Sequence, residues 1–272
     1  MPADARIPVA MTIASSDSGG GAGIQADLKA FARCGVHGTS AIVALTAQNT
    51  HHVASIETLP RQFILDQVGA VASDMGVDVV KIGMLFDAPI IEAVEEALDL
   101  VGDAPVVLDP VMVAESGAVL LQPEAKRALI ERIMPRASVV TPNAAEAREL
   151  TGLGEEVSPR DLARAVHALG PKVVVVTGGH LDGTDRYFDG EQQVGIGGPR
   201  HPEGTAHGSG CTHSSVLAAR LALGDTPLEA ARTARRIAAE AVANGLRGIG
   251  AGAGPVDVLA AIRERPENGR PA

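Results

Sequence analysis

The sequence predicts an α/β fold in which a central, mostly parallel sheet is flanked by helices on both faces. Short runs rich in Val and Ile alternate with segments of helical periodicity along nearly the whole chain, which is the pattern of repeated strand–helix–strand units. Hydrophobic residues make up 46% of the 272 residues and aromatic residues only 2%, so small aliphatic side chains must build the core.

Each predicted strand is an apolar run bounded by turn residues, and each predicted helix has apolar residues at helical spacing. Asp87, Ser158 and Thr226 stand where side chains cap helices, and Pro159 and Pro227 occupy first helical positions. In chain order we expect a strand over residues 9–14, a helix around 24–31, a strand over 40–45, a helix over 63–75, a strand over 77–82, a helix over 89–101, a strand over 105–108, a helix over 124–133, a strand over 138–140, a short helix ending at 150, a helix over 159–169, a strand over 172–177, a hairpin over 187–196, a helix over 211–223 and a last helix from 226.

These elements form one domain over residues 9–262, because neither a repeat nor a linker divides them. We expect residues 1–8 to be flexible and residues 263–272, rich in charge, Pro and Gly, to form a disordered tail. Ligands of open α/β sheets bind at the carboxyl ends of the strands, so the residues directly after the strands are the first candidates for a site.

Composition argues against several classes of function. The formal net charge is −10, and Lys and Arg are not gathered in one segment, which argues against nucleic-acid binding. The two cysteines lie far apart in sequence and suggest no disulfide framework, and no signal peptide or membrane-spanning run is evident. We therefore expect a cytoplasmic protein that binds neither nucleic acid nor membrane.

The strongest sign of chemistry lies in residues 207–213. Gly208, Ser209 and Gly210 precede Cys211, and a helix-forming run follows, so several backbone N–H groups should point to one spot at a helix N-terminus. Such a spot binds anions and lowers the pKa of a thiol, which suits phosphoryl transfer. Two alternatives are zinc binding by the Cys and His side chains of this segment and an inert core position for the thiol.

A glycine-rich loop over residues 15–23 follows the first strand, and Gln48 follows the second. The glycines allow the backbone to approach a ligand closely. A dinucleotide-binding fingerprint and a plain turn are alternatives, but the fingerprint requires an acidic residue at the end of the second strand, where the chain reads TAQNT. The side-chain amide of Gln48 donates and accepts, which suits an amino-substituted heteroaromatic ring; the alternative is a solvated loop amide.

Carboxylates follow two consecutive strands. Asp109 comes after the strand over residues 105–108, and Glu146 follows the strand over residues 138–140. Two such carboxylates, with waters and phosphates, make a Mg²⁺ site. The alternatives are a helix cap for Asn143 and an exposed first-turn carboxylate for Glu146.

Together these segments resemble the hydroxymethylpyrimidine/phosphomethylpyrimidine kinases of thiamine biosynthesis. Six motifs match that family in order, and the resemblance runs over residues 9–259. The motifs are TIASSDSGGGAGIQADLK at 12–29, TAQNT at 46–50, KIGML at 81–85, DPVMV at 109–113, VTPN at 140–143 and GSGCT at 208–212. The resemblance implies the ribokinase-like three-layer fold, use of ATP and Mg²⁺, and a homodimer.

The resemblance also implies roles for single residues. Gln48 would hydrogen-bond the aminopyrimidine ring of the substrate, and Met84 would pack against it. Cys211 would accept the proton of the substrate hydroxyl within an anion hole formed from Gly208, Ser209 and Gly210. Asp109 and Glu146 would hold Mg²⁺. Further candidates are Asp17, Gly21 and Val111 for substrate, and Thr177, Gly178, Gly179, Asn143 and Thr212 for ATP.

Two positions depart from the family pattern. Members usually carry Lys at the positions of Thr177 and Glu115, so two positive charges are missing from this chain, and related pyridoxal kinases share the first change. We predict an ATP-dependent kinase of 4-amino-5-hydroxymethyl-2-methylpyrimidine and of its monophosphate. A pyridoxal kinase and a catalytically weak pyrimidine-binding relative are the alternatives. The missing charges should weaken the second phosphoryl transfer more than the first.

Overall fold

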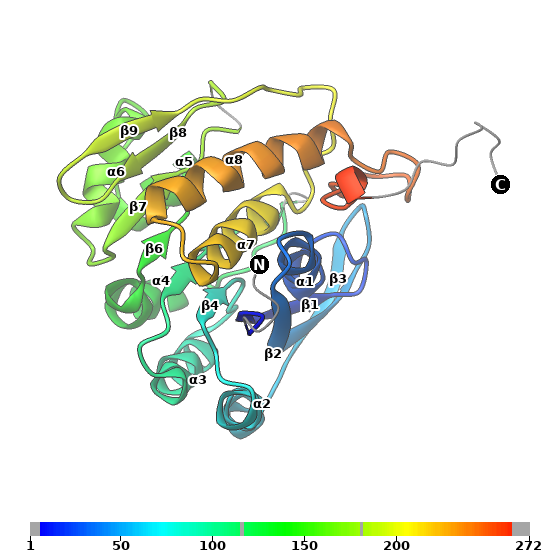
Figure 1. The fold of residues 1–272 in the computed structure, drawn as a ribbon, viewed down its shortest axis with the longest axis vertical. Coiled ribbons are helices and arrows are strands. Elements are labelled where there is room, and N and C mark those ends of the chain that lie inside the picture. Colours follow the sequence, from blue (N-terminus) through cyan, green and yellow to red (C-terminus); the bar gives the residue numbers. More distant parts are fainter. Residues whose placement is uncertain (1–5, 115–116, 180–181, 263–272) are drawn as a thin grey trace.

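The computed structural model describes residues 6–114, 117–179 and 182–262. Its strands are β1 (Val9–Asp17), β2 (His37–Gln48), β3 (Val53–Thr58), β4 (Val79–Ile82), β5 (Val106–Leu108), β6 (Val139–Val140), β7 (Val173–Val176), β8 (Asp185–Phe188) and β9 (Gln193–Ile196). They form one sheet in the order β3-β2-β1-β4-β5-β6-β7-β8-β9 (Figure 1). The strands from β2 to β7 in this order pair in parallel, and the edge pairings of β3, β8 and β9 are antiparallel, so the predicted mostly parallel sheet is confirmed.

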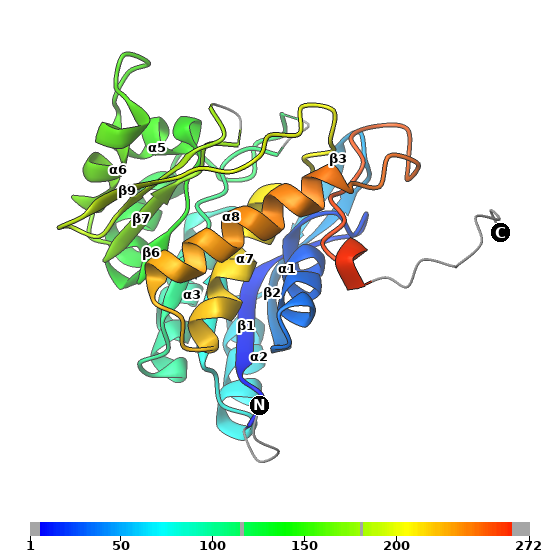
Figure 2. The ribbon, with the colours of Figure 1, turned by 45° about the horizontal axis from the view of Figure 1, so that its top comes forward.

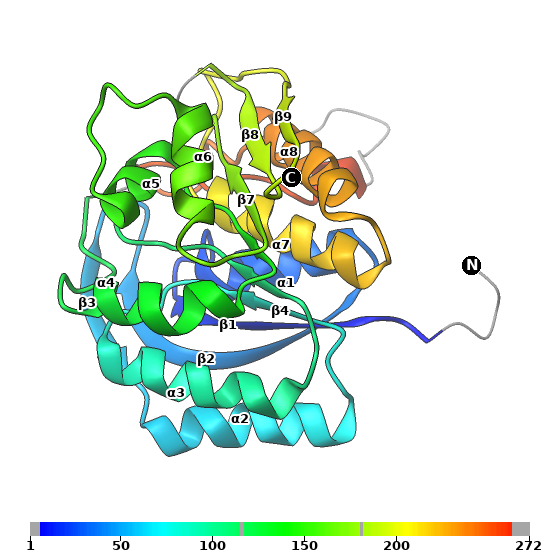
Figure 3. The same cartoon turned by 90° about the vertical axis from the view of Figure 1, so that its left-hand side faces the viewer.

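The helices form a layer on each face of the sheet. One layer contains α1 (Gly23–Arg33), α7 (Ser209–Ala222) and α8 (Pro227–Ala243), which lie side by side in Figure 2. The other contains α2 (Arg61–Asp74), α3 (Ala88–Leu98), α4 (Ala125–Ala128), α5 (Ala144–Thr151) and α6 (Pro159–His167). Figure 3 shows α2 and α3 on the opposite side of β1 and β2 from α1 and α7, as a three-layer fold requires.

Two apolar cores fill the spaces between the sheet and these layers, because successive residues of a strand point to opposite faces. In β4, Val80 and Ile82 join the core under α2 and α3, whereas Val79 joins the core under α1 and α7. Lys81 follows the same alternation and points toward α1 and α7, where its side chain is fully buried.

Some local structure differs from the expectations. The edge strand β3 was not expected, and its residues are half-buried or exposed rather than buried. The helix expected over residues 124–133 begins as α4 but continues as a π-helical turn (Leu129–Ile133) and a 3₁₀ turn (Met134–Arg136). Further 3₁₀ turns cover Asp99–Val101 and Ala260–Ile262. The expected hairpin is confirmed as β8 and β9.

The order of the strands locates a binding edge. β1 is flanked by β2 on one side and by β4 on the other. The chain passes from β1 to β2 through α1 and returns from β3 through α2 to β4, so the direction of winding reverses at β1 and opens a crevice at the carboxyl ends of the strands. At the other end of β1, Arg6 donates to the Asp78 carboxylate at 3.0 Å, which ties part of the segment expected to be flexible to the domain. Residues 1–5, Glu115 and the expected tail over 263–272 lie outside the described residues. Across the described ranges, no helix is long and apolar enough to cross a membrane.

Candidate active site

A cavity of about 720 Å³ opens at the carboxyl ends of the parallel strands, and the first residues of α1 and α7 form part of its wall. Most of the residues expected at the site line this one cavity, although they come from both ends of the chain. They are Asp17, Gln48, Met84, Asp109, Val111, Asn143, Glu146, Thr177, Gly179, Gly208, Ser209, Gly210 and Cys211.

Three expected ligand contacts are not on the cavity wall. Gly21 lies under the ring of His207, where a Cβ atom would collide with that ring. Gly178 packs in the same way against the backbone of Thr184. Thr212 is fully buried. The two glycines therefore serve close packing behind the cavity, and Thr212 points inward because it lies on the face of α7 that packs on the sheet.

The N-termini of α1 and α7 meet at the thiol of Cys211. The backbone amide of Gly23, the first residue of α1, lowers the pKa of the Cys211 thiol, and Cys211 is the third residue of α7. Neither helix has a side-chain cap, whereas α3, α5, α6 and α8 do. The Ser209 amide donates to the Ala206 carbonyl at 2.9 Å, but the amides of Gly210 and Cys211 have no acceptor in the described part of the chain. These amides are available to an anion.

The expected lowering of the Cys211 pKa is wrong. Burial raises the pKa of the thiol to about 12; Asp109 and Asp27 raise it further, and Lys81 and the Gly23 amide oppose them. Removal of the sulfur from water therefore outweighs the donors that would stabilise a thiolate. Because the thiol lies half-buried on the cavity wall, bound ligands would change its surroundings directly.

The two predicted carboxylates lie together on the wall. Burial raises the pKa of Glu146 to about 8, and the charge of Asp109 adds to this. Burial also raises the pKa of Asp109, against the ammonium group of Lys81 and a 3.0 Å hydrogen bond from the Ser214 hydroxyl. A cation near both carboxylates would stabilise their ionised forms and lower the pKa values of Glu146 and Asp109. Within the described residues no cluster of three His, Cys, Asp or Glu side chains forms, but Mg²⁺ needs only one or two carboxylates with waters and phosphates, so the pair fits it.

A capping box orients Glu146. The side chain of Asn143 accepts from the Glu146 N–H at 2.9 Å, and the Glu146 carboxylate accepts from the Asn143 N–H at 2.8 Å. The alternative reading of Asn143 as a helix cap is therefore correct. The reading of Glu146 as an exposed carboxylate is wrong, because the side chain is half-buried at the cavity.

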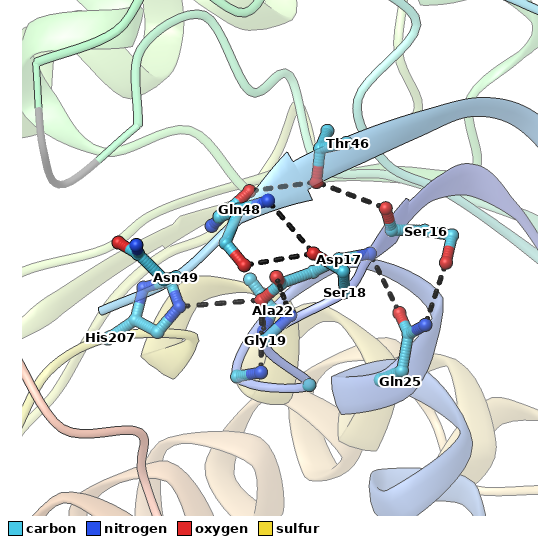
Figure 4. Close-up of polar contacts among 12 residues, drawn as sticks. Ser16, Asp17, Ser18, Gly19, Ala22, Gln25, Thr46, Gln48, Asn49 and His207 are labelled. Atoms are coloured by element: carbon cyan, nitrogen blue, oxygen red, sulfur yellow. Dashed lines mark hydrogen bonds and ion pairs between the residues drawn. The ribbon is translucent and has the colours of Figure 1, made fainter. Parts of the chain in front are cut away.

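Asp17 organises the glycine-rich loop. Its carboxylate accepts the amides of Gly19, Gly21 and Ala22 at 2.7, 3.0 and 2.9 Å and lies 3.5 Å from the ring of His207 (Figure 4). Burial raises the pKa of Asp17, but the hydrogen bonds from His207 and the three amides together lower it below the ordinary value. Both carboxylate oxygens of Asp17 are thus hydrogen-bonded within the protein, and these contacts fix the conformation of the loop that precedes α1.

Gln48 is held at the end of β2. The Ser18 hydroxyl donates to the Gln48 carbonyl at 2.9 Å and accepts the Gln48 N–H at 2.8 Å, and the Thr46 hydroxyl donates to the side-chain oxygen at 3.1 Å (Figure 4). The side-chain NH₂ group has no acceptor among the residues that the structure describes. The amide is therefore oriented at the cavity wall with donors available to a ligand.

Sequence reasoning missed the pairing of His213 with Asp185 and two charged groups on this wall. His213 lies with its Nε2 atom 3.0 Å from Asp185, whose second oxygen accepts the Gly178 N–H at 2.9 Å. Arg235 and Lys81 also line the cavity. A lysine within the apolar run VVKI was a usable signal for Lys81, whereas nothing in the sequence pairs Asp185 with His213.

Comparison with known proteins agrees with this geometry. The family model of phosphomethylpyrimidine kinase matches residues 17–257. The chain is 46% identical to the hydroxymethylpyrimidine/phosphomethylpyrimidine kinase of Rhizobium meliloti over 256 residues, which cover 91% of this chain and 96% of that protein. The pyridoxal kinase of Staphylococcus aureus, in complex with AMP-PCP and pyridoxal, has a TM-score of 0.84 at 32% identity over 95% of this chain and 96% of that one, which confirms the expected kinase fold.

A third relative is longer than this chain. The thiamine biosynthesis bifunctional protein of Geobacter sulfurreducens is 46% identical over 263 residues, or 94% of this chain. The match covers 54% of that protein, so the chain spans about half the length of this bifunctional relative.

Proposed function

This chain belongs to the phosphomethylpyrimidine kinase family, and we propose that it phosphorylates the hydroxymethyl group of 4-amino-5-hydroxymethyl-2-methylpyrimidine and then the resulting monophosphate, with ATP as the donor. The observation that carries this proposal is that Gln48 and the uncapped N-terminus of α7 at Cys211 share one cavity. The amide suits an amino-substituted ring, and the helix N-terminus suits a phosphate group.

The ring would bind between Gln48 and Met84. The amide of Gln48 offers the paired donor and acceptor that match an aminopyrimidine edge. The sulfur of Met84 accepts a hydrogen bond from the Ser15 hydroxyl at 3.2 Å, which fixes the thioether as an apolar wall for the ring. This arrangement favours the aminopyrimidine over rings without an amino group.

The nucleotide would occupy the rest of the cavity. Ala238 and Val242 of α8, together with Pro199, give part of the wall an apolar surface that suits the adenine base, and Arg235 of the same helix adds a charge to this wall. The phosphates would lie against Thr177 and Gly179 and reach the open amides of α7. Asp109 and Glu146 would hold Mg²⁺, which supplies positive charge to the transferring phosphoryl group when bound.

Positioning and charge stabilisation supply most of the rate enhancement, because the transition state of phosphoryl transfer is loose. The amides of Gly210 and Cys211 stabilise negative charge on the transferring oxygens. The sulfur of Cys211, in its ionised form, accepts the proton of the substrate hydroxyl as the oxygen attacks the γ-phosphorus. The bond from phosphorus to the bridging oxygen breaks, and its electron pair stays with ADP.

A pyridoxal kinase is the second candidate. The observation that favours it is the close fold similarity to the pyridoxal kinase complex reported above, together with Thr177 at a position where aminopyrimidine kinases usually carry Lys. The amides of Gly210 and Cys211 argue against the third alternative, a catalytically weak pyrimidine-binding protein, because they have no acceptor in the described chain and are available to a phosphate group.

ADP release measured with a panel of alcohols tests the proposal. The aminopyrimidine alcohol, its monophosphate, pyridoxine and pyridoxal are compared at saturating ATP and Mg²⁺. We expect the highest kcat/KM for the aminopyrimidine alcohol, and a preference for pyridoxal would favour the second candidate instead.

The same assay tests the second phosphoryl transfer. The monophosphate should be the poorer substrate, and Thr177→Lys should improve its turnover more than that of the alcohol. Equal efficiency on both substrates, unchanged by Thr177→Lys, would refute the expected effect of the missing charges. The homodimer and the cytoplasmic location stay predictions.

A further inference from the structure

Beneath the cavity lies a fully buried ion pair that the proposed mechanism has not used. The Nζ atom of Lys81 lies 2.9 Å from a carboxylate oxygen of Asp27, and both side chains have no exposed surface. The Asp27 carboxylate also accepts hydrogen bonds from the hydroxyls of Thr12 and Ser215, each at 2.6 Å. The pair therefore joins β1, α1, β4 and α7 at one point.

We do not expect this ion pair to contribute to the stability of the fold. Burying two charges costs several kcal/mol per ion, and apolar residues of similar volume are often as stable in their place. The Asp27 carboxylate accepts hydrogen bonds from two hydroxyl groups, whereas the Lys81 ammonium group is left without a hydrogen bond of good geometry in the described chain. The ammonium group is thus the less satisfied member of the pair, and its charge acts on groups beyond Asp27.

The surroundings direct the ammonium group toward the active site. Lys81 lies next to the carboxyl end of β4, and its Nζ atom packs so closely on Gly83 that a Cβ atom there would stand 2.9 Å from it. Nζ lies 3.9 Å from the Asp109 carboxylate. Lys81 and Cys211 line the same cavity, and the charge of Lys81 opposes the rise in the pKa of the Cys211 thiol. The charge of Lys81 therefore acts on a predicted metal-binding carboxylate and on the predicted proton acceptor.

We propose that Lys81 is an electrostatic positioning residue for phosphoryl transfer, whose buried ammonium group favours the ionised form of the Cys211 sulfur and holds Asp109 in place. The proposal rests on the function proposed above. Asp27 anchors the ammonium group from behind, so that its charge stays fixed while negative charge develops in front of it. Since the Lys81 side chain has no exposed surface with which to bind a substrate, Lys81 should affect kcat and leave the KM values nearly unchanged.

Steady-state kinetics of four variants test this role. Lys81→Met removes the ammonium group. Lys81→Met with Asp27→Asn removes both members of the pair, which keeps their summed charge at zero and does not leave the Asp27 carboxylate buried without a partner. Asp27→Asn alone keeps the ammonium group. Ser215→Ala removes a 2.6 Å hydrogen bond from the same cluster without changing a charge and serves as the matched control.

We expect the double variant to fold and to lose roughly 100-fold in kcat, with KM for both substrates within about threefold of wild type. Ser215→Ala should stay near the wild-type kcat, and Asp27→Asn should lose less than the double variant. A double variant with wild-type kcat, or with a raised KM alone, would overturn the proposal. A kcat loss in Ser215→Ala as large as in the double variant would also overturn it, because the cluster would then act only as a structural support.

A second measurement does not depend on the substrate. In a Cys34→Ala background, which leaves Cys211 as the one thiol, iodoacetamide should alkylate the double variant roughly tenfold more slowly than wild type at a fixed mildly alkaline pH. Equal alkylation rates would overturn the role of Lys81. If the wild type instead phosphorylates only pyridoxal, the proposed function fails, and the kinetic comparison of Lys81 is made with that alcohol.

Discussion

Gly208 and Gly21 touch through their backbones, so closely that a Cβ atom on Gly208 would collide with the carbonyl oxygen of Gly21. Gly208 also has a φ of +82°, a left-handed conformation that residues with a Cβ atom rarely adopt. This contact brings the loop before α1 against the start of α7 and places both helix N-termini at one thiol. The two glycines thus hold the anion-binding geometry together.

We expect Gly208→Ala to lower the free energy of unfolding by about 3 kcal/mol or more, because the cost of the left-handed backbone conformation adds to the cost of the collision with Gly21. Gly224→Ala is the matched control. Gly224 has a φ of +91°, but no heavy atom lies within 4 Å of its would-be Cβ position, so only the strain of about 1–2 kcal/mol remains. Urea denaturation measures both. Equal losses in the two variants would show that the Gly208–Gly21 contact has no effect on stability.

Glu146 should make the stability of the unliganded protein depend on pH. Its pKa is about 8 in the folded protein against an ordinary value of 4.5, so the folded state keeps a proton that the unfolded state has lost. The free energy of unfolding must therefore fall as pH rises from about 5 to 8. Glu146→Gln should remove this pH-dependent loss of stability. At pH 8.5 the free energy of unfolding should rise by about 1–2 kcal/mol, which corresponds to a rise in Tm of roughly 2–8 °C.

Glu149→Gln is the control for that experiment, because Glu149 lies exposed on the same helix and pairs with Lys126 at the surface. It should change Tm little at any pH. Addition of Mg²⁺ at pH 8.5 should stabilise the wild type more than Glu146→Gln. A Glu146→Gln variant whose Tm follows the wild type across this pH range would contradict the buried carboxylate pair.

Gln48→Leu should raise KM for the aminopyrimidine alcohol by roughly 10–100-fold, since the ring's amino edge would lose its partners in a desolvated site. KM for ATP should stay unchanged, because in the proposed complex Gln48 contacts the pyrimidine ring and not the nucleotide. Gln62→Leu, a change at an exposed glutamine on α2, controls for the loss of an amide elsewhere. A rise in KM for ATP of the same size would place Gln48 with the nucleotide instead.

Much of the fold follows from local sequence. The runs that became β1, β4, β5 and β7 are apolar and short, and Asp87, Ser158 and Thr226 cap the helices where they were expected. The sequence does not predict β3, because an edge strand with exposed residues lacks the apolar run by which a buried strand is recognised. The π-helical turn after α4 departs from expectation because helical periodicity does not distinguish it from a regular α-helix.

The site was predictable only in part. Most of the residues predicted from motifs at strand ends line the cavity, since the carboxyl ends of parallel strands converge, but the wall from α8 and residues 199–206 was not predicted. The state of Cys211 was not predictable, because a helix N-terminus can be read from sequence but burial cannot, and burial has the larger effect on the thiol. The buried pair of Lys81 and Asp27 depends on contacts between four elements, which no local pattern reports.

The central claim is that the terminal phosphoryl group of ATP passes to the substrate's hydroxymethyl oxygen next to Cys211. A rapid-quench single-turnover experiment with ATP labelled at the γ-phosphate measures this transfer in the wild type and in Cys211→Ala, with calorimetry of pyrimidine binding to both. We predict labelled pyrimidine monophosphate from the wild type, a rate at least about 100-fold lower in Cys211→Ala, and similar pyrimidine affinity. Transfer at the wild-type rate by Cys211→Ala, or no label in the pyrimidine from the wild type, would contradict the account.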